Sequence, residues 1–485
     1  MSFSEYLSKY LADNNLTVAQ ASKKIGIDRS ILFRYTTGNR KPLNTETVED
    51  IAERLCMSAK EKKEFIEEFD KQTLGDEVVS SFHYVNRLME TLSNADTFNS
   101  QNLSSITADM YMNNYSFTQK SSYLTSPQAI IACAMHIFEN EKNNNTGDSV
   151  KLLMQPTYSK IEGILTPIFS GSDKIIEQII CLEKAMEKCY TNLYAIEELI
   201  TPVFCLKNFN VYYHYDIVQS HISTASLLPN LILTNSCALL FDFEMRNGFF
   251  TQDKEFIKLL DKHFVELKNN CSPFLEKGSY THVVQESNMV IPSSRIGTIF
   301  NQPCIVPCLG SEILNKLVVD FPLKSTLVNT LIGIHGDWNG MEHIPPMSYA
   351  TCCCNKKGIL DIFRTGRIGE FPDKYYLPFT KDICIIILKR MIYLQEHNLH
   401  NYIILKNSFN LSDTIQIYWI PEKHAITLRY TSTDNLLQIN IVETSIFNSI
   451  KNYIDYIEKK GLCYTQEETI EFLKKVLDMV INDEL

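Results

Sequence analysis

The sequence predicts a multidomain protein in which a small all-α domain precedes a large α/β or α+β body that can form two lobes. The chain has 485 residues, more than the roughly 250–300 at which single hydrophobic cores stop growing. Short helical patterns fill the first 70 residues, whereas strand and helix patterns alternate after residue 127. Such alternation is typical of an α/β layer architecture.

Composition favours a globular chain without membrane segments. Hydrophobic residues make up 45% of the chain and charged residues 21%, proportions that disordered chains do not reach. No leader pattern opens the sequence, and the apolar run at 385–388 is far shorter than the about 20 residues of a membrane span. We therefore expect a soluble, cytoplasmic protein with no membrane partner.

Two short helices joined by a tight turn are expected near the N-terminus. Thr17 can cap a helix at 18–25, which Gly26 would end in the left-handed conformation. Asp28 can cap the next helix, at 29–35. Two short helices with a glycine-containing turn between them form a helix-turn-helix unit.

Three further helices are expected around this unit. Apolar residues at helical spacing predict a first helix that begins at Phe3 and ends before Asn14. A fourth helix would open at Thr45 or Thr47 and a fifth would span 59–69. Residues 3–70 would then fold as one all-α domain.

This region resembles the Cro/repressor-like (XRE) helix-turn-helix domains. The match covers about Leu16 to Met57 and rests on LTVAQASKKIGIDRSILFRYTTGNRKP followed by VEDIAERLCM. The positions that satisfy the family pattern in register are Thr17, Gly26, Asp28, Leu32, Tyr35, Gly38, Arg40 and Pro42. The sequence departs from it at Val18, Ser22 and Thr36, where the family often has Gln, Ala and Glu. The resemblance implies binding to double-stranded DNA by a homodimer, because such domains usually act as symmetric pairs on two half-sites.

The helix at 29–35 has one face suited to reading bases. Leu32 and Tyr35 lie three positions apart and should face the first two helices. The residues expected on the opposite side as base-reading groups are Arg29, Ser30 and Phe33. In the major groove, arginine can bind guanine, serine can bond to either base type, and an apolar ring can contact a thymine methyl group.

Polar and cationic residues beside this helix should contact the DNA backbone. Those residues are Thr17, Arg34, Thr37, Asn39, Arg40 and Lys41. Residues 16–42 contain six cations and a single acid, Asp28, although the whole chain has a formal net charge of -11. Such segregation places one positive surface on an acidic protein, which favours local contact with nucleic acid.

The remaining chain is divided into three expected regions. Residues 71–126 read as a helical and polar connector, 127–280 as an α/β lobe, and 281–485 as an α+β lobe for effector sensing or dimerisation. Helices are expected near 128–141, 161–169, 194–203, 256–267, 382–399, 446–458 and 466–481. Strands are expected near 150–154, 175–182, 211–215, 402–405, 414–419, 425–430 and 437–442, and residues 230–243 are expected to form two adjacent strands.

The body contains no recognisable catalytic motif. Gly-rich phosphate loops, HExxH and GxSxG are absent from the sequence. The stretch GIHGDWNGMEHIPP gathers His335, Asp337, Glu342 and His343 around a tryptophan, and we interpret it as a polar loop rather than a ligand site. We therefore predict no catalytic residue, no enzyme activity and no cofactor.

The fourteen cysteines are expected to be packing residues. Their spacing forms no disulfide framework. Two groups stand out, Cys304 with Cys308 and the triplet 352–354, but neither matches the paired spacing of a metal site. We therefore predict no bound metal.

Two classes of function remain open. In the first, the DNA-binding domain is coupled to a body that senses a small molecule or a peptide, which makes a transcriptional regulator. In the second, the body is an enzyme or a defence-type effector, and the helix-turn-helix domain tethers it or regulates its expression. The missing active-site motif favours the first class.

Overall fold

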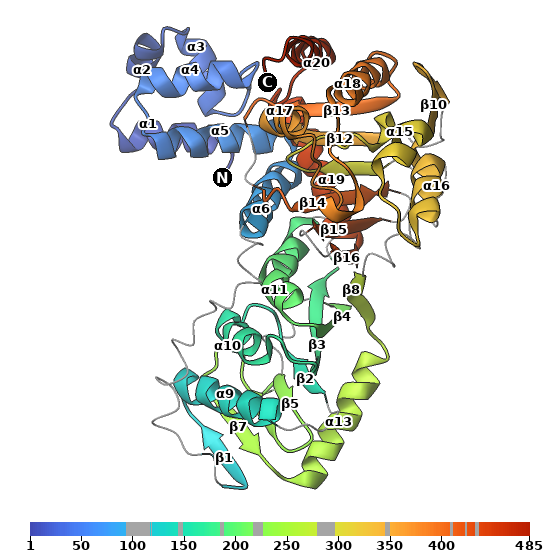
Figure 1. The fold of residues 1–485 in the computed structure, drawn as a ribbon. Coiled ribbons are helices and arrows are strands. Elements are labelled where there is room, and N and C mark those ends of the chain that lie inside the picture. The colour runs from blue at the N-terminus through green and yellow to red at the C-terminus, as the bar shows by residue number, and fades with distance from the viewer. Residues whose placement is uncertain are drawn as a thin grey trace. The chain divides into compact units, whose positions relative to one another are not determined.

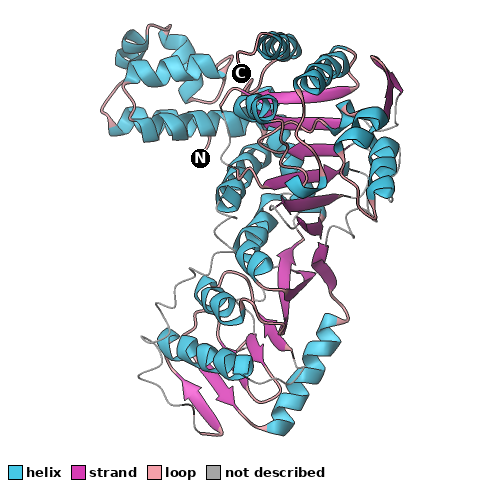
Figure 2. Cartoon of the chain, in the orientation of Figure 1, coloured by secondary structure: helices cyan, strands magenta, loops and turns pink. Residues whose placement is uncertain are grey.

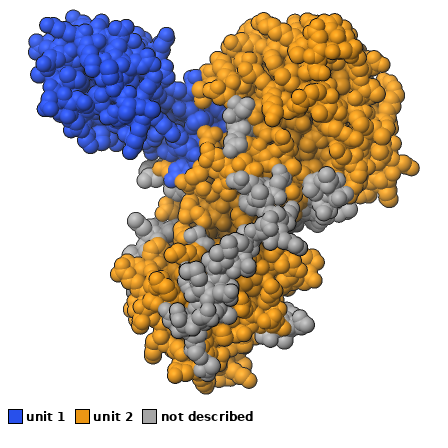
Figure 3. All heavy atoms as spheres, turned by 60° about the vertical axis from the view of Figure 1, so that its left-hand side comes forward, with its two compact units in different colours: residues 1–85, 449–460 blue, residues 86–448, 461–485 orange. Residues whose placement is uncertain are grey.

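The chain divides into two compact units. The computed structural model describes residues 1–93, 117, 119–143, 149–184, 189–216, 227–278, 296–344, 350–407, 411–421, 424–431 and 436–485. The first unit comprises residues 1–85 and 449–460, and the second comprises 86–448 and 461–485 (Figure 3). The compact N-terminal unit therefore contains residues 71–85 and 449–460 in addition to the predicted domain at 1–70.

Five helices occupy the first 74 residues of the first unit (Figure 1). They are α1 (Phe3–Asp13), α2 (Val18–Ile25), α3 (Arg29–Thr36), α4 (Thr45–Leu55) and α5 (Ala59–Leu74). These are the helices expected from the sequence, and α5 extends five residues beyond the predicted end at residue 69. Their apolar faces meet in one core, in which Leu7, Leu32, Val48 and Phe65 have no exposed surface.

Two more helices contribute to this unit and continue into the second. The first part of α6 (Asp76–Ser93) and the last part of α19 (Thr444–Lys459) belong to the first unit. Tyr453 and Tyr456 of α19 are buried, and the ring of Phe82 in α6 stacks on both of them. Residues distant in sequence therefore complete the packing of the N-terminal unit.

The second unit is built on a mixed sheet, in agreement with the predicted α/β body. Fourteen of the described strands, which Figure 2 draws in magenta, form one sheet in the order β1-β7-β6-β5-β2-β3-β4-β8-β16-β15-β14-β9-β12-β13. These strands are β1 (Ser121–Leu124), β2 (Val150–Leu153), β3 (Ile175–Glu183), β4 (Asn208–Asp216), β5 (Asn230–Leu233), β6 (Ala238–Phe241), β7 (Gly248–Thr251), β8 (Ser272–Gly278), β9 (Ile296–Ile299), β12 (Ala350–Asn355), β13 (His400–Leu405), β14 (Ile415–Ile420), β15 (Ala425–Thr431) and β16 (Leu436–Val442).

Parallel and antiparallel pairing alternate across this sheet. Strands β2, β3 and β4 are parallel neighbours, and so are β9, β12 and β13. Antiparallel hairpins extend each set: β5, β6 and β7 beside β2, and β14, β15 and β16 beside β9. Strand β8 pairs with β4 through its first residues and with β16 through its last. The hydrogen bonding is therefore continuous across the two regions that the sequence separates near residue 280.

Helices cover the sheet and connect its parallel strands. In Figure 1, α9, α10 and α11 lie on one face of β2 to β5, and α13 lies on the other. The helices of this unit are α9 (Pro127–Asn143), α10 (Ser159–Phe169), α11 (Leu193–Cys205), α13 (Lys254–Lys268), α15 (Gly310–Leu317), α16 (Lys324–His335), α17 (Lys356–Thr365), α18 (Lys381–Glu396) and α20 (Gln466–Ile481). Thr465 and Glu468 form the capping box of α20.

Glycine at position 297 is required by a close aromatic contact, which gives a test of the sheet. Trp419 of β14 lies opposite Gly297 of β9, and a Cβ atom at Gly297 would lie 1.7 Å from the indole ring. We expect Gly297→Ala to lower the melting temperature, with a loss of stability of about 1–3 kcal/mol, as is usual for overpacking. In the matched control, Gly333→Ala in α16, the Cβ meets no atom within 4 Å. That change should stabilise the helix by about 0.5–1 kcal/mol. Equal melting temperatures for the two variants would contradict the packing of Trp419.

The buried glutamate Glu162 predicts a dependence of stability on pH. It is 4% exposed, Gln178 Nε2 donates to its Oε1 at 3.0 Å, and burial raises its pKa from 4.5 to about 7. Between these values the unfolded chain has lost this proton while the folded chain keeps it, so the wild type loses stability as pH rises. We expect Glu162→Gln to melt at a higher temperature than the wild type at pH 8. Its free energy of unfolding should exceed that of the wild type by a difference on the order of 3 kcal/mol. The two should melt alike near pH 4, and a constant difference between pH 4 and 8 would contradict this assignment.

Candidate nucleic-acid interface

The rotation of α3 is fixed by two buried side chains. Leu32 is fully buried and Tyr35 is 6% exposed, so these two residues anchor α3 in the core of the first unit. Asp28 caps the helix, since its Oδ1 accepts from the Ser30 amide at 2.7 Å. The predicted inner face of this helix is therefore confirmed.

The opposite face of α3 is exposed. Arg29, Ser30, Phe33 and Arg34 are all exposed, and Phe33 retains 55% of its accessible surface. None of the described residues forms a hydrogen bond or an ion pair with the guanidinium group of Arg29 or Arg34. An aromatic ring between unpaired cations on a polar helix surface is available for a partner that is both anionic and partly apolar.

Ser30 is less free than its neighbours on this face. Its hydroxyl donates to Asp28 Oδ1 at 2.6 Å, and its amide donates to the same oxygen. Both bonds lower the pKa of Asp28, and the bond from the hydroxyl has the larger effect on that pKa. The predicted base-reading role of Ser30 therefore requires its hydroxyl to accept a bond, or to exchange Asp28 for a base.

Three of the predicted backbone-contact groups already bind within the protein. The Thr17 hydroxyl takes part in the capping box with Gln20. The Thr37 hydroxyl donates to the carbonyl of Phe33 at 2.9 Å and accepts from Asn39 Nδ2 at 3.0 Å. Phosphate contacts from these hydroxyls would therefore compete with bonds that end or begin a helix.

The cations in the segment after α3 also differ in whether they already have a partner within the protein. Lys41 Nζ donates to the carbonyl of Gln72 in α5 at 2.9 Å. Arg40 is exposed, and its guanidinium group has no hydrogen bond or ion pair among the described residues. Gly38, with φ of 75°, supplies the left-handed turn that leads the chain from α3 to Arg40. Arg34 and Arg40 are thus the freest cations of the predicted backbone set.

The cations of α4 and α5 contrast with those of α3. Arg54 pairs with Asp50 at 2.7 Å and Lys62 pairs with Glu53 at 2.7 Å. Lys71 pairs with Glu67 at 2.8 Å. Intramolecular carboxylates neutralise these three cations, whereas Arg29, Arg34 and Arg40 have no carboxylate partner among the described residues.

One exposed apolar residue beside this surface was not expected from the sequence. Leu43, in the segment between α3 and α4, is 88% exposed. No periodic pattern covers this short segment, so hydrophobic spacing could not assign Leu43 to a surface or to a core. Its position after Pro42 is the one signal that places it in the turn.

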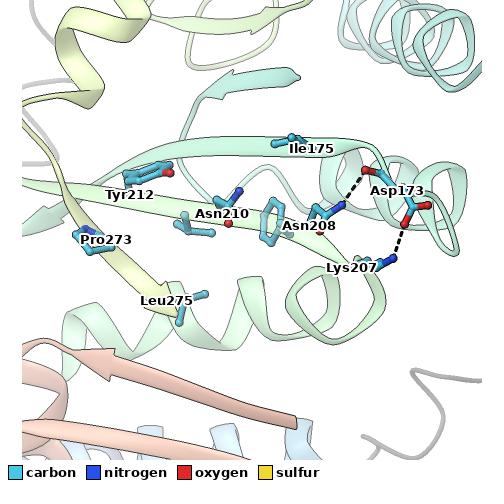
Figure 4. Close-up of a pocket in the computed structure, with 10 residues that line it drawn as sticks. Asp173, Ile175, Lys207, Asn208, Asn210, Tyr212, Pro273 and Leu275 are labelled. Carbon is cyan, nitrogen blue, oxygen red and sulfur yellow. Dashed lines mark hydrogen bonds and ion pairs between the residues drawn. The ribbon is translucent and has the colours of Figure 1, made fainter. Parts of the chain in front are cut away.

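The second unit contains hollows large enough for a small molecule. One of about 540 Å³ lies where β8 leaves β4, and its lining includes Asn208, Asn210 and Tyr212 (Figure 4). Lys207 pairs with Asp173 at its rim, at 2.5 Å. Another, of about 410 Å³, is lined by apolar and polar residues of β2 to β6 and α13, which include His214 and His263.

The segment around Trp338 differs from the expected polar loop. Residues 337–339 and 342–344 form a two-stranded antiparallel hairpin, β10 (Asp337–Asn339) and β11 (Glu342–Ile344). Trp338 is buried, and its Nε1 donates to the carbonyl of Pro307 at 2.8 Å. The loop prediction was wrong because burial of the indole ring fixes this segment against the body, which local polarity does not reveal.

The two cysteine groups lie in the core of the second unit. Cys304, Cys308 and the triplet 352–354 are buried and form no disulfide. Within the described residues, no three His, Cys, Asp or Glu side chains gather as a metal site requires. Among the described helices, none combines the length and apolar character needed to cross a membrane.

No protein-family model matches the chain, and no curated protein matches it. Among solved structures, it is similar to TrmBL2, an archaeal chromatin protein with a novel mode of DNA binding, at 9% identity and a TM-score of 0.23, over 56% of this chain and 93% of that chain. It is also similar to phosphatidylserine synthase from Haemophilus influenzae Rd KW20, at 8% identity and a TM-score of 0.22, over 78% of this chain and 97% of that chain. Neither likeness is close enough to bear on function.

The Asp28 cap gives a test of how α3 is held. We expect Asp28→Ala to speed amide hydrogen exchange at Ser30, because the acceptor is lost, whereas Asp28→Asn keeps an acceptor oxygen and should retain protection. Because the pKa of Asp28 is lowered from 3.8 in the folded chain, the contribution of the carboxylate is present above that value and disappears as pH falls through the lowered pKa. The Asn variant should show no such loss, and equal exchange in both variants would contradict the cap.

Proposed function

We propose that the protein is a sequence-specific regulator that binds double-stranded DNA through the exposed face of α3. The observation that carries this proposal is the exposed ring of Phe33, which lies on the same helix face as Arg29 and beside Arg34 while Leu32 and Tyr35 anchor the opposite side. An α-helix fits the major groove, and this face offers a cation for guanine and an apolar ring for thymine.

The surroundings of α3 would supply contacts that hold the protein on the duplex without reading sequence. Arg34 and Arg40 carry free guanidinium groups, which suit phosphate because they can donate two bonds in parallel. The whole chain has a formal net charge of -11, and its acidic remainder would oppose indiscriminate binding of DNA elsewhere on the surface. Binding would thus be confined to one side of the first unit.

The second unit is proposed to sense an effector and to support a homodimer. A single helix reads few base pairs, so two copies on half-sites about 10 bp apart would supply the discrimination that one lacks. The hollow where β8 leaves β4 offers amide groups from Asn208 and Asn210 beside the ring of Tyr212. This lining suits a small polar molecule or a short peptide.

Replacing the base-reading residues should remove sequence preference. We expect the double variant Arg29→Ala/Phe33→Ala to bind its preferred site no more tightly than a mixed-sequence duplex, because each lost base contact is worth about 1–3 kcal/mol. The preferred site is obtained by selection from a random duplex pool with the wild-type protein. A double variant that keeps the wild-type preference would overturn the proposal.

Replacing a backbone-contact cation should have a different effect. We expect Arg40→Ala to weaken binding to the preferred site and to mixed-sequence DNA by the same factor, and to reduce the slope of log K against log salt by about one. The measurement is a fluorescence anisotropy titration at several salt concentrations. The control is Lys60→Ala, an exposed cation of α5 near Glu64, which should leave both the affinity and the slope unchanged.

A further inference from the structure

Helix α19 belongs to both units of the chain. It runs without interruption from Thr444 to Lys459, and its residues from Ser449 onward, with Lys460, are part of the first unit (Figure 3). One helix therefore has its first residues in the second unit and its last residues in the first unit.

The C-terminal end of α19 is locked to the first unit through a buried carboxylate. Lys460 Nζ lies 2.8 Å from Asp70 Oδ1, and the Tyr456 hydroxyl donates to Asp70 Oδ2 at 3.0 Å. Lys460 Nζ also donates to Thr45 Oγ1 at 2.7 Å. The side chains of Asp70 and Lys460 are 2% and 12% exposed. We refer to Asp70, Lys460, Tyr456 and Thr45 as the Asp70 lock.

The Asp70 lock adjoins the segment that follows α3. Thr45 is the first residue of α4, directly after the segment 37–44 that contains Arg40. Within this segment, Lys41 donates to the carbonyl of Gln72, two residues after Asp70. The segment 37–44 is thus tied to α5 through Lys41 and to α19 through Thr45.

The N-terminal end of α19 is fixed within the second unit. The buried Glu443 accepts from the amide of Ile446 at 2.8 Å and from the hydroxyl of Tyr215, in β4, at 2.6 Å. Asn192 Nδ2 donates to Ser445 Oγ at 2.9 Å. Strand β4 also lines the hollow of about 540 Å³. One helix therefore carries a polar anchor at each end, the first of them attached to an effector-sized hollow through β4.

We propose that α19 couples the body to DNA binding, and that Lys460 is a positioning residue which sets the conformation of the segment 37–44 through the Asp70 lock. This inference rests on the proposed function, because the segment matters to affinity only if Arg40 contacts DNA. When α19 shifts, Lys460 leaves Thr45 or Asp70, and the segment loses its attachment to α19 at Thr45. Loss of that attachment weakens contacts to phosphate without altering the base-reading face of α3.

The test compares two neighbouring lysines in the full-length chain. Lys460→Gln removes the lock cation, whereas Lys459→Gln removes an exposed cation that lies 3.8 Å from Asp455 and takes no part in the lock. We expect Lys460→Gln to speed amide exchange across residues 37–45 and to weaken binding to a mixed-sequence duplex by about 5- to 150-fold, the usual range of coupling between sites. Lys459→Gln should match the wild type in both measurements.

A second pair of variants separates positioning from folding. Tyr456→Phe keeps the stacking on Phe82, at a ring separation of 4.2 Å, and removes just the hydroxyl that binds Asp70. It should change exchange and binding in the same direction as Lys460→Gln. Lys460→Arg retains a cation and should restore part of the affinity. These variants remain informative if Lys460→Gln unfolds the first unit.

The outcomes separate this inference from the proposed function. Unchanged exchange at 37–45 in both Lys460→Gln and Tyr456→Phe overturns the inference. Faster exchange with unchanged duplex binding also overturns the inference. In that case the proposed function still stands if the Arg29→Ala/Phe33→Ala and Arg40→Ala variants change DNA binding as expected. A wild-type chain that binds no duplex at low salt overturns both together.

Discussion

Burial of Leu32 and Tyr35 is the constraint on which the candidate interface depends. Each large apolar side chain contributes about 1.5–3 kcal/mol on burial, and both lie on one side of α3. A half-turn of the helix would expose them and would bury Phe33 together with an arginine. Burying an unpaired guanidinium group adds several kcal/mol of desolvation. The core therefore selects one rotation of α3. This rotation alone places Arg29 and Phe33 on the exposed face of the helix.

A second constraint acts on the segment after α3 and comes from far along the chain. Asp70 is a buried carboxylate whose partners, Tyr456 and Lys460, follow it by almost 400 residues. Removing one partner of such a pair typically destabilises a protein by about 3–5 kcal/mol, because a charge stays buried without compensation. The ion pair need not make the fold more stable than an apolar pair of similar size at the same place would. Its value lies in specifying how α19 meets α4 and α5.

The sequence predicts the helices of the first unit because their signals are local. Thr17, Gly26 and Asp28 each act within three residues, as a cap or a turn, and the structure places all three as expected. Many of the body's helices and strands were recognised for the same reason, from short periodic patterns, but β8, β9, β12, α15, α16 and α17, which lie between residues 272 and 365, were not predicted. Strand order was not predictable, because pairings such as β8 with both β4 and β16 join residues up to about 165 positions apart. The hairpin at Trp338 and the Asp70 lock escaped prediction on the same ground.

The candidate site shows the same division between local and long-range information. Exposure of Arg29 and Phe33 follows from the helical period, whereas the partners of Ser30 and Lys41 depend on side-chain geometry. A hydroxyl or ammonium group that already has a partner gains less from a phosphate, because binding exchanges one bond for another. Guanidinium groups without a partner in the protein give up just their bonds to water when they bind a phosphate. Under the proposed function, affinity for DNA would accordingly concentrate in the arginines, while Thr17, Thr37 and Lys41 would keep the helices and their connecting segment in the shape that presents those arginines.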